Sequence, residues 1–419
     1  MPHSNPTQPW TRTHRMVFRF GFVYLLLYLL PFPAIGPLRQ AYRHLWQVIV
    51  LWVGEHLLRL ERPILYTFNG SGDMTFHYVQ LLCFMVLAGL GALCWSLLAS
   101  SLHYQRLHGW LRCYVRYFLA SAMLGYGFAK VFVLQFPMPA PELMVMSYAE
   151  SSPMGLLWRF MGASPGYTIF GGALELFGGM LLFWRRTTTL GALVVGGVMA
   201  NVVALNFCYD VPVKIFSTHL LMMTLFLLLP EARRLFDFFV RNRATAAVAL
   251  EVAFPQPWIR HGRLVLKSLF ISFALFINIV GVLEWRSRYD SKPESAALYE
   301  VESFVYDGVA RPPLLTDPIR WRWVSTWQQG LFQIRWMNET TQRFQMEQDP
   351  KARTITLIDP QAPNQRVLFT YEESAPGRLV LEGQFRGGWL RVQLKRLDLR
   401  ASPLFSRGFH WINEHPYYQ

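Results

Sequence analysis

The chain has 419 residues, of which 53% are hydrophobic and only 16% are charged, and its formal net charge is +14. Ordinary soluble domains carry about 25% charged residues, so this composition points to a protein largely surrounded by lipid. The excess of Lys and Arg lies beside apolar runs, whereas the C-terminal third is nearly charge-balanced, which argues against a nucleic-acid partner. The four cysteines form no CxxC pair, which argues against a disulfide framework and against thiol–disulfide quinone chemistry.

Apolar runs with few charges predict about seven membrane-spanning helices, since about 20 apolar residues cross roughly 30 Å of hydrocarbon. The expected spans are residues 20–38, 74–105, 118–141, 160–174, 187–209, 215–230 and 268–283. No cleavage site with small residues follows the first run. We therefore expect this run to be retained as a span and not removed as a signal peptide.

The basic residues form four clusters beside these runs: before the first span, between the second and third, between the fourth and fifth, and before the last. With seven spans, all four clusters fall on one side, which the positive-inside rule makes cytoplasmic. We therefore expect a multi-pass protein of a bacterial inner membrane, with a cytoplasmic N-terminus and a periplasmic C-terminal domain. Several arginines oppose this orientation: Arg39, Arg43, Arg59, Arg62, Arg286 and Arg288.

Two shorter features precede the second span. Residues 44–56 are too short and too polar at their ends to span comfortably, and Trp46 and Trp52 suit the headgroup zone. We expect an interfacial helix there, with a re-entrant segment as the alternative. Residues 69–74 form a glycine-rich turn in which Asp73 is expected to cap the helix that follows. This turn lacks the Lys-Ser/Thr ending of a P-loop, so it does not indicate nucleotide binding.

Two charges interrupt segments that otherwise indicate membrane-spanning helices: Lys130 in the third expected span, and Glu175 in the fourth, where it directly follows the charge-free run 160–174. A charge at the centre of a bilayer costs roughly 2.5–3.5 kcal/mol on insertion scales, so such residues are usually paired and functional. We expect Lys130 and Glu175 to pair with each other. Four glycines near Glu175 should clear one helix face for the close approach of another helix. They are Gly171, Gly172, Gly178 and Gly179.

The fifth and sixth expected spans supply further polar residues. Asp210 and Lys214 lie at the outer boundary between these spans, where a solvated ion pair is the favoured interpretation. Asn206 and His219 lie deeper, where hydrogen bonding between helices would account for each residue without a function. If these side chains face the buried charges, they form a polar pocket that opens toward the periplasmic side.

After residue 285 the pattern becomes that of a β domain, so we expect a helical domain over 1–290 and a β domain over 296–419. Strand-like stretches at 353–358, 366–371, 378–385 and 390–396 are separated by turn residues at 363–364, 374–377 and 386–388. The short connections predict an antiparallel meander that closes into a small barrel or sandwich. Its tryptophans are expected to form the core: Trp321, Trp323, Trp327, Trp336 and Trp389.

Four motifs together resemble the DoxX-like membrane proteins: Tyr126-Gly-Phe-Ala-Lys130, Ser152-Pro-Met-Gly-Leu-Leu-Trp158, Gly172-Ala-Leu-Glu175 with Gly178 and Gly179, and Tyr209-Asp-Val-Pro-Val-Lys214. The resemblance covers about residues 112–230, the four-helix core of that family. The wider superfamily includes the small subunit of thiosulfate:quinone oxidoreductase and the membrane domain of vitamin-K-dependent carboxylases, which handle quinones. The resemblance therefore implies a quinone-type ligand. The sequence contains no haem, flavin or metal-binding pattern.

The leading hypothesis is a component of a quinone-linked membrane oxidoreductase, with a redox partner protein and the ligand bound among the third to sixth helices. Lys130 would polarise a carbonyl oxygen and Glu175 would move a proton, as the catalytic residues. The expected ligand-binding residues are Tyr126, Asn206, Asp210, Lys214 and His219. The alternatives are a non-enzymatic scaffold whose periplasmic β domain recruits a partner, and a transporter of a small solute or lipid. Whether the chain forms a homo-oligomer is left open.

Overall fold

The computed structural model of the chain describes residues 10–34, 36–66, 69–99, 104–245, 257–290, 297–326 and 330–416. The chain divides into two compact units. The helical unit comprises Met1–Gln135 and Gly166–Val282, and the barrel unit comprises Phe136–Pro165 and Leu283–Gln419. The barrel unit therefore includes a stretch from the middle of the chain in addition to the C-terminal domain.

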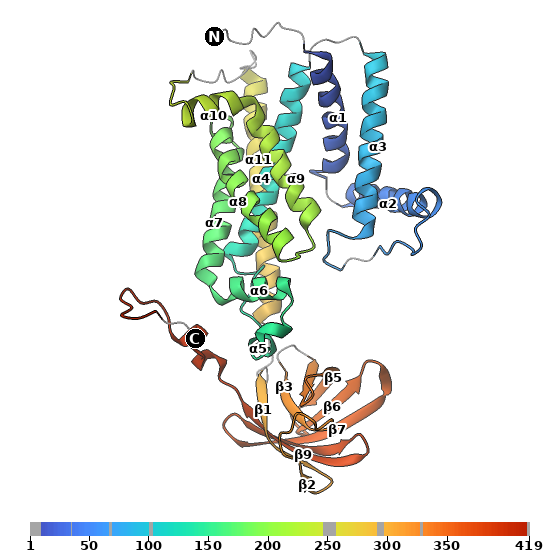
Figure 1. The fold of residues 1–419 in the computed structure, drawn as a ribbon, viewed down its shortest axis with the longest axis vertical. Helices are drawn as coiled ribbons and strands as arrows, with labels where there is room; N and C mark the ends of the chain where they lie inside the picture. Colours follow the sequence, from blue (N-terminus) through green and yellow to red (C-terminus); the bar gives the residue numbers. More distant parts are fainter. Residues whose placement is uncertain are drawn as a thin grey trace. The chain divides into compact units, whose positions relative to one another are not determined.

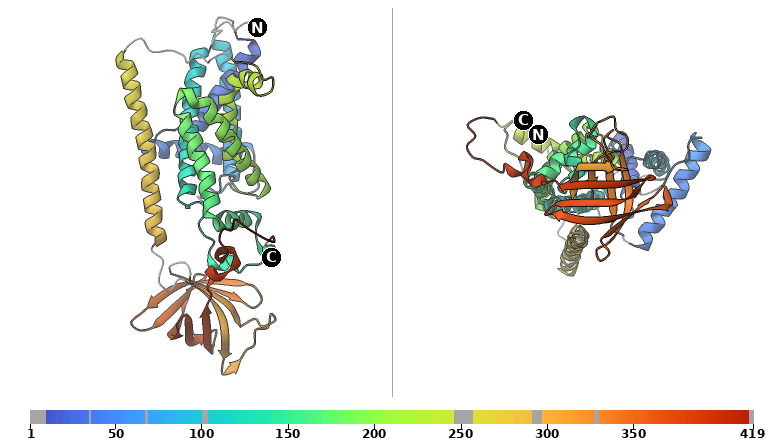
Figure 2. Two further views of the ribbon diagram at one scale, coloured as in Figure 1. Left: turned by 90° about the vertical axis from the view of Figure 1, so that its left-hand side faces the viewer. Right: turned by 90° about the horizontal axis from the view of Figure 1, so that it is seen from below.

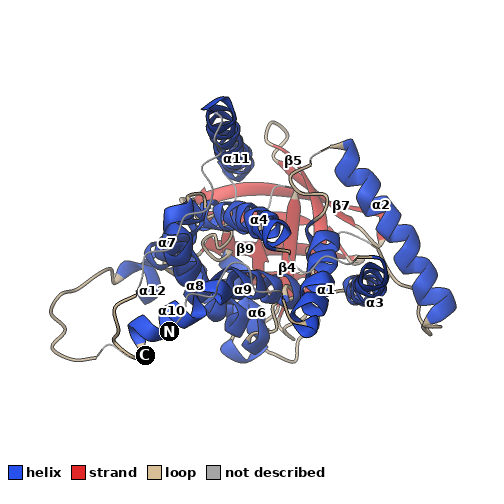
Figure 3. Cartoon of the chain, turned by 90° about the horizontal axis from the view of Figure 1, so that it is seen from above, coloured by secondary structure: helices blue, strands red, loops and turns tan. Residues whose placement is uncertain are grey.

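The helical unit is a bundle of α-helices. Its elements are α1 (Arg12–Leu29), α2 (Pro37–Trp52), a π-helical turn (Val53–Leu57), α3 (Thr75–Leu98), α4 (Gln105–Val131), α7 (Pro165–Leu182), α8 (Thr188–Cys208), α9 (Lys214–Leu228), α10 (Ala232–Phe239) and most of α11 (Pro257–Asp290). Helices α1 and α3 lie side by side, and α2 crosses next to them at a steep angle (Figure 1, Figure 3). The buried core of this unit includes Leu119 and Met123 of α4, Leu182 of α7 and Val195 of α8.

Four helices among the described residues are long and apolar enough to cross a membrane: Thr75–Leu98, Arg185–Cys208, Lys214–Phe239 and Leu264–Arg286. They correspond to the second, fifth, sixth and seventh expected spans, and they are compatible with a membrane protein. The expectation of about seven spans is not supported by these helices. Within the part of the chain that the structure describes, the first, third and fourth expected spans do not form helices of the required length and hydropathy.

Helix boundaries and charges explain this difference. The first apolar run is interrupted where α1 ends at Leu29, and the first half of α1 carries arginines. The third run is cut short because α4 ends at Val131. Helix α4 also carries several cationic side chains, namely Arg106, Arg112, Arg116 and Lys130. The fourth run is divided between α6 (Pro153–Ala163) and α7, because proline at the start of α7 favours the first turn of a new helix.

Helix α2 occupies the place of the predicted interfacial helix but begins earlier, at Pro37. Trp46 and Val50 are four residues apart and therefore share one face of the helix. Both are buried in a cluster with Phe76 and Phe84 of α3, and the rings of Trp46 and Phe84 meet edge to face at 4.5 Å. The helix is thus confirmed, and its location at a membrane interface stays a prediction.

Asp73 caps a different helix from the one predicted. Helix α3 begins after Met74, and the Asp73 carboxylate turns instead toward the first residues of α9. It accepts hydrogen bonds from the backbone N–H groups of Lys214 and Ile215, at 2.7 and 3.0 Å. The glycine-rich turn before α3 therefore holds the start of α9, 141 residues later in the chain.

The barrel unit combines short helices with an antiparallel sheet (Figure 2). Its elements are α5 (Pro141–Met144), a 3₁₀ turn (Tyr148–Glu150), α6, β1 (Leu298–Tyr306), β2 (Val309–Ala310), β3 (Trp321–Ser325), β4 (Leu331–Trp336), β5 (Thr341–Asp349), β6 (Thr354–Asp359), β7 (Ala362–Ala375), β8 (Arg378–Phe385), β9 (Gly388–Arg396) and α12 (Pro403–Ser406). The described strands pair in the order β2-β1-β3-β4-β5-β6-β7-β8-β9, and β1 also pairs with β9. This last pairing closes every strand except β2 into a barrel, which confirms the predicted antiparallel β domain.

The predicted strands 378–385 and 390–396 correspond to β8 and β9, and 353–358 corresponds to β6. The predicted turn at Pro363 and Asn364 is wrong, because both residues lie inside β7. The pairing of β6 with β7 explains why β7 begins before the predicted strand 366–371. Asp359 pairs with Ala362, so the chain reverses at Pro360 and Gln361.

The tryptophans of the β domain do not all lie in its core. Trp321 is fully buried and Trp336 is 4% exposed, as predicted, and the Trp321 ring contacts Phe385 edge to face at 5.3 Å. Trp389 is 58% exposed, so its assignment to the core is wrong, because it alternates with the buried Leu390 along β9. Trp323 is partly buried, and Trp327 lies outside the described residues.

Candidate functional site

Lys130 and Glu175 form a buried ion pair in the helical unit. Lys130 lies in the last turn of α4 and Glu175 in the middle of α7. The Lys130 Nζ atom donates hydrogen bonds to Glu175 Oε1 at 2.6 Å and Oε2 at 2.7 Å. The two side chains are 9% and 3% exposed. The expected pairing is therefore confirmed, and the catalytic roles of the two residues stay predictions.

Glycines allow α4 and α7 to approach closely at this pair. A Cβ atom at Gly172 would lie 2.6 Å from Lys130 Cβ and 2.8 Å from the Gly127 oxygen, far inside van der Waals contact. Gly178 faces α8 instead, where a Cβ would lie 2.7 Å from a Val195 methyl group, and nothing lies within 4 Å of a Cβ at Gly171. The glycines therefore serve two helix contacts, and not the single face that the sequence predicts.

Tyr126 lies one turn before Lys130 on α4, and the Lys130 Nζ atom is 5.4 Å from the centroid of its ring. The half-buried Tyr126 hydroxyl makes no hydrogen bond to any residue that the structure describes. An ammonium group has three N–H donors, and two of those of Lys130 are used by Glu175. One N–H of Lys130 and the Tyr126 O–H are thus neighbouring donors that Glu175 does not occupy.

His219 of α9 is held between two tyrosines of α1. Its Nδ1 atom lies 2.7 Å from the Ile215 backbone oxygen, which requires the proton on Nδ1. Its Nε2 atom shares a second hydrogen bond with the Tyr24 hydroxyl, at 2.6 Å. The Tyr28 ring stacks on the imidazole, with centroids 4.0 Å apart. The imidazole is consequently held by a hydrogen bond at each ring nitrogen.

Tyr28 and Tyr126 pack against the same buried core of the helical unit. Sequence reasoning missed Tyr24 and Tyr28. Their spacing of four residues in an apolar helix, which places both hydroxyls on one face, is the signal that could have revealed them.

The other candidate residues pair locally. Asn206 of α8 is buried and donates a hydrogen bond from Nδ2 to the Ser217 hydroxyl of α9, at 3.0 Å. Asp210 and Lys214 form an ion pair at 2.7 Å in the connection between α8 and α9, where the Asp210 side chain is 83% exposed. These contacts agree with the structural interpretations of all three residues, and a ligand-binding role for them stays untested. Within the described residues, no three His, Cys, Asp or Glu side chains gather as metal ligands would.

Comparisons with known proteins give one informative relative. No family model matches the chain, and no solved structure matches it. A curated protein from Bacillus subtilis (strain 168), described as "Uncharacterized protein YwoB", is 36% identical to this chain over 124 residues. The aligned part makes up 30% of this chain and 79% of the relative.

Proposed function

The chain belongs to the same family as YwoB, and we propose that it is a redox-associated membrane protein that binds a quinone headgroup beside Lys130 and Glu175. The buried ion pair between these residues carries the proposal, since ionisable groups inside helical membrane bundles mark functional sites by default. The resemblance to the DoxX-like proteins supports the choice of a quinone. We further propose the inner membrane of a bacterium. A cytoplasmic N-terminus and a periplasmic β domain need an odd number of spans, so this part of the proposal requires at least one crossing helix besides the four apolar ones.

The donor set fits the chemistry of a quinone. Quinone carbonyl oxygens accept hydrogen bonds, and the remaining Lys130 N–H and the Tyr126 O–H are neighbouring donors. A bound quinone would supply two-electron, two-proton redox chemistry, with the electrons delivered or removed by a redox partner protein. Glu175 would hold the Lys130 ammonium in place and exchange one proton with the site.

Quinone content tests this proposal. The full chain is purified in mild detergent and extracted with organic solvent, and quinone and phospholipid are quantified by mass spectrometry. The Lys130→Ala/Glu175→Ala variant removes both charges together, so neither is left buried without its partner. The matched control is Arg241→Ala/Asp237→Ala, which removes a partly exposed ion pair at the C-terminal end of α10. We expect near-stoichiometric quinone in the wild type and in the control, and loss of quinone in the Lys130/Glu175 variant.

A scaffold is the second candidate function. The close contact of α4 and α7 at Gly172 favours it, because the ion pair could serve only to orient these two helices. Glu175→Gln separates the two candidates. The amide oxygen can still accept a hydrogen bond from Lys130, but the amide carries no negative charge and cannot exchange a proton with the site. Quinone loss with unchanged expression and thermal stability supports the redox role. Loss of folded protein supports the architectural role.

A further inference from the structure

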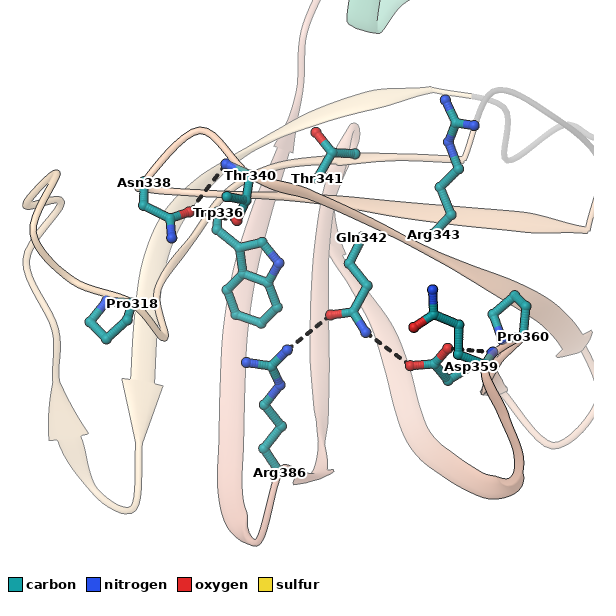
Figure 4. A pocket seen from close by; sticks show the side chains of 11 residues that line it. Pro318, Trp336, Asn338, Thr340, Thr341, Gln342, Arg343, Asp359, Pro360 and Arg386 are labelled. Atoms are coloured by element: carbon teal, nitrogen blue, oxygen red, sulfur yellow. Dashed lines mark hydrogen bonds between the residues drawn. The ribbon is translucent and has the colours of Figure 1, made fainter. Parts of the chain in front are cut away.

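The barrel unit contains a cavity of about 800 Å³ at one end of the barrel. Its lining includes the end of β4, the start of β5, the end of β6 and the turn between β8 and β9 (Figure 4). The central lining residues are Trp336, Asn338, Thr340, Gln342, Asp359 and Arg386. This volume falls within the roughly 300–1,000 Å³ of small-molecule sites.

Three planar polar side chains form a row in this cavity: Gln342 of β5, Asp359 of β6, and Arg386 of the turn between β8 and β9 (Figure 4). Arg386 donates a hydrogen bond from Nη2 to Gln342 Oε1 at 2.9 Å, and Gln342 donates from Nε2 to Asp359 Oδ2 at 3.0 Å. The Gln342 amide thus stands between the cation and the carboxylate and keeps them from pairing directly. The row is therefore ordered in advance of any ligand.

Arg386 occupies a backbone position that arginine rarely adopts. Its φ of 52° and the φ of 90° at Gly387 are typical of a two-residue hairpin turn that favours Asn, Asp or Gly. The Arg386 side chain is held against Trp336, because its guanidinium lies 4.4 Å from the centroid of the Trp336 ring. A disfavoured backbone that presents a charged side chain to a cavity is a sign of function.

Several polar groups that line the cavity keep unused hydrogen-bonding capacity among the described residues. Arg386 keeps N–H donors beyond the one bound to Gln342, and it forms no ion pair with a described carboxylate. Asn338 Oδ1 accepts from the amide and hydroxyl of Thr340, which leaves its NH₂ group as a donor. Asp359 accepts from Gln342 and from a backbone N–H, and a carboxylate has about four acceptor positions.

We propose that this cavity binds a sugar of one or two rings through the Arg386–Gln342–Asp359 row. A sugar hydroxyl donates and accepts at the same time, so adjacent hydroxyls match a site in which free donors lie beside free acceptor positions. The charged members strengthen these bonds, because hydrogen bonds to ionised groups are about twice as strong as neutral ones. This binding activity is independent of the quinone site in the helical unit.

Ligand-observed saturation-transfer NMR tests the proposal. The full-length protein in lipid nanodiscs is mixed in turn with glucose, N-acetylglucosamine and glucuronate, the last of which adds a carboxylate for Arg386. Gln342→Ala removes the amide that bonds both Arg386 and Asp359, and Asp359→Asn removes the negative charge at the end of the row. The matched control is Gln345→Ala, an exposed residue of the same type on the same strand. Barrel folding is checked in every variant by near-ultraviolet circular dichroism, to which the buried Trp321 contributes.

We expect saturation transfer to at least one of the three sugars, with affinity about tenfold lower in Gln342→Ala and Asp359→Asn. The control should bind as the wild type does. The proposal is overturned if none of the sugars receives saturation, or if both row variants stay folded and bind with unchanged affinity. If Gln342→Ala does not fold, Asp359→Asn, which keeps the shape of the side chain, decides the question.

Discussion

At the scale of single residues, the Lys130–Glu175 pair is the feature whose energetics are most open to test. Both side chains are buried, so removing one charge leaves the other without its partner. We expect Glu175→Ala to destabilise the helical unit by about 3–5 kcal/mol, and Lys130→Met/Glu175→Leu to be close to neutral. Thermal unfolding of the purified protein in detergent, followed by circular dichroism, measures both.

An exposed pair provides the control for this comparison. Asp237→Ala breaks the contact of α10 with Arg241, two residues after the helix ends, and surface pairs of this kind contribute about 0–1 kcal/mol. Equal destabilisation by the single Glu175 variant and by the double variant would contradict the account, because it would mean that the two charges do not depend on each other.

The pairing of Lys130 with Glu175 could be predicted from the sequence because each is an isolated charge in an apolar run. The surroundings of His219 could not, since its partners Tyr24 and Tyr28 lie about 190 residues earlier in the chain. Tyrosine is also common in apolar helices, so its presence alone points to no partner. Local pattern identifies residues that must find a partner, and the tertiary fold determines which partner they find.

At the scale of elements, we expect alanine substitutions at two adjacent glycines of α7 to have opposite effects on stability. A methyl group at Gly172 meets Lys130 Cβ and the Gly127 oxygen, so Gly172→Ala must push α4 and α7 apart at a cost of about 1–3 kcal/mol. Gly171→Ala meets nothing within 4 Å and should be neutral or stabilising by about 0.5–1 kcal/mol, through higher helix propensity. Unfolding temperatures of the two variants check this, and equal effects would show that the helices do not approach closely at Gly172.

The cap that Asp73 provides for α9 gives a second prediction at this scale. Asp73→Ala removes the acceptor of the Lys214 and Ile215 N–H groups and should cost about 1 kcal/mol. Hydrogen exchange followed by mass spectrometry should show faster exchange at the start of α9. Asn69→Ala changes the same turn without touching α9 and serves as the control. Unchanged exchange in the Asp73 variant would rule out the cap.

Some strands of the barrel could be predicted from the sequence and others could not, because the strands differ in how many apolar residues they contain. β6 and β8 contain runs of apolar residues that stand out locally. β5 reads Thr-Gln-Arg-Phe-Gln-Met-Glu-Gln-Asp and buries only Phe344 and Met346, so it resembles a polar loop until its neighbours are known. Pro363 and Asn364 have the composition of a turn but lie in β7, at the register shift between the pairs Ile358–Arg366 and Asp359–Ala362.

At the scale of the whole molecule, the barrel unit is assembled from segments that are far apart in the chain. Arg335 of β4 contacts Glu150 of the 3₁₀ turn at 2.6 Å, and the Ser325 hydroxyl donates to Glu142 of α5 at 3.2 Å. These contacts bring the segment before α7 into the same unit as the barrel. No local pattern in the sequence could predict this association, since each residue is an ordinary surface polar group when considered alone.

Glu150 makes this association dependent on pH. Hydrogen bonds from the Ser147 N–H and hydroxyl, together with the Arg335 guanidinium, hold the pKa of Glu150 below its ordinary value. Because the pKa is lower in the folded state, the stabilisation is present above the unfolded pKa of about 4.3 and is lost as the pH falls through the folded pKa. Glu150→Gln should therefore lower the unfolding temperature at pH 7, and the difference from wild type should vanish in acid. Glu372→Gln on β7 is the control, and a difference that grows in acid would contradict this sign.

The most direct test of the proposed function is redox-induced difference infrared spectroscopy of the purified protein in lipid. The account predicts that reduction of the bound quinone changes a carboxyl band, that Glu175→Gln removes this change, and that Glu150→Gln leaves it intact. A spectrum with no carboxyl change, or one that is the same in Glu175→Gln as in the wild type, would contradict the role of Glu175 as the group that exchanges a proton with the quinone.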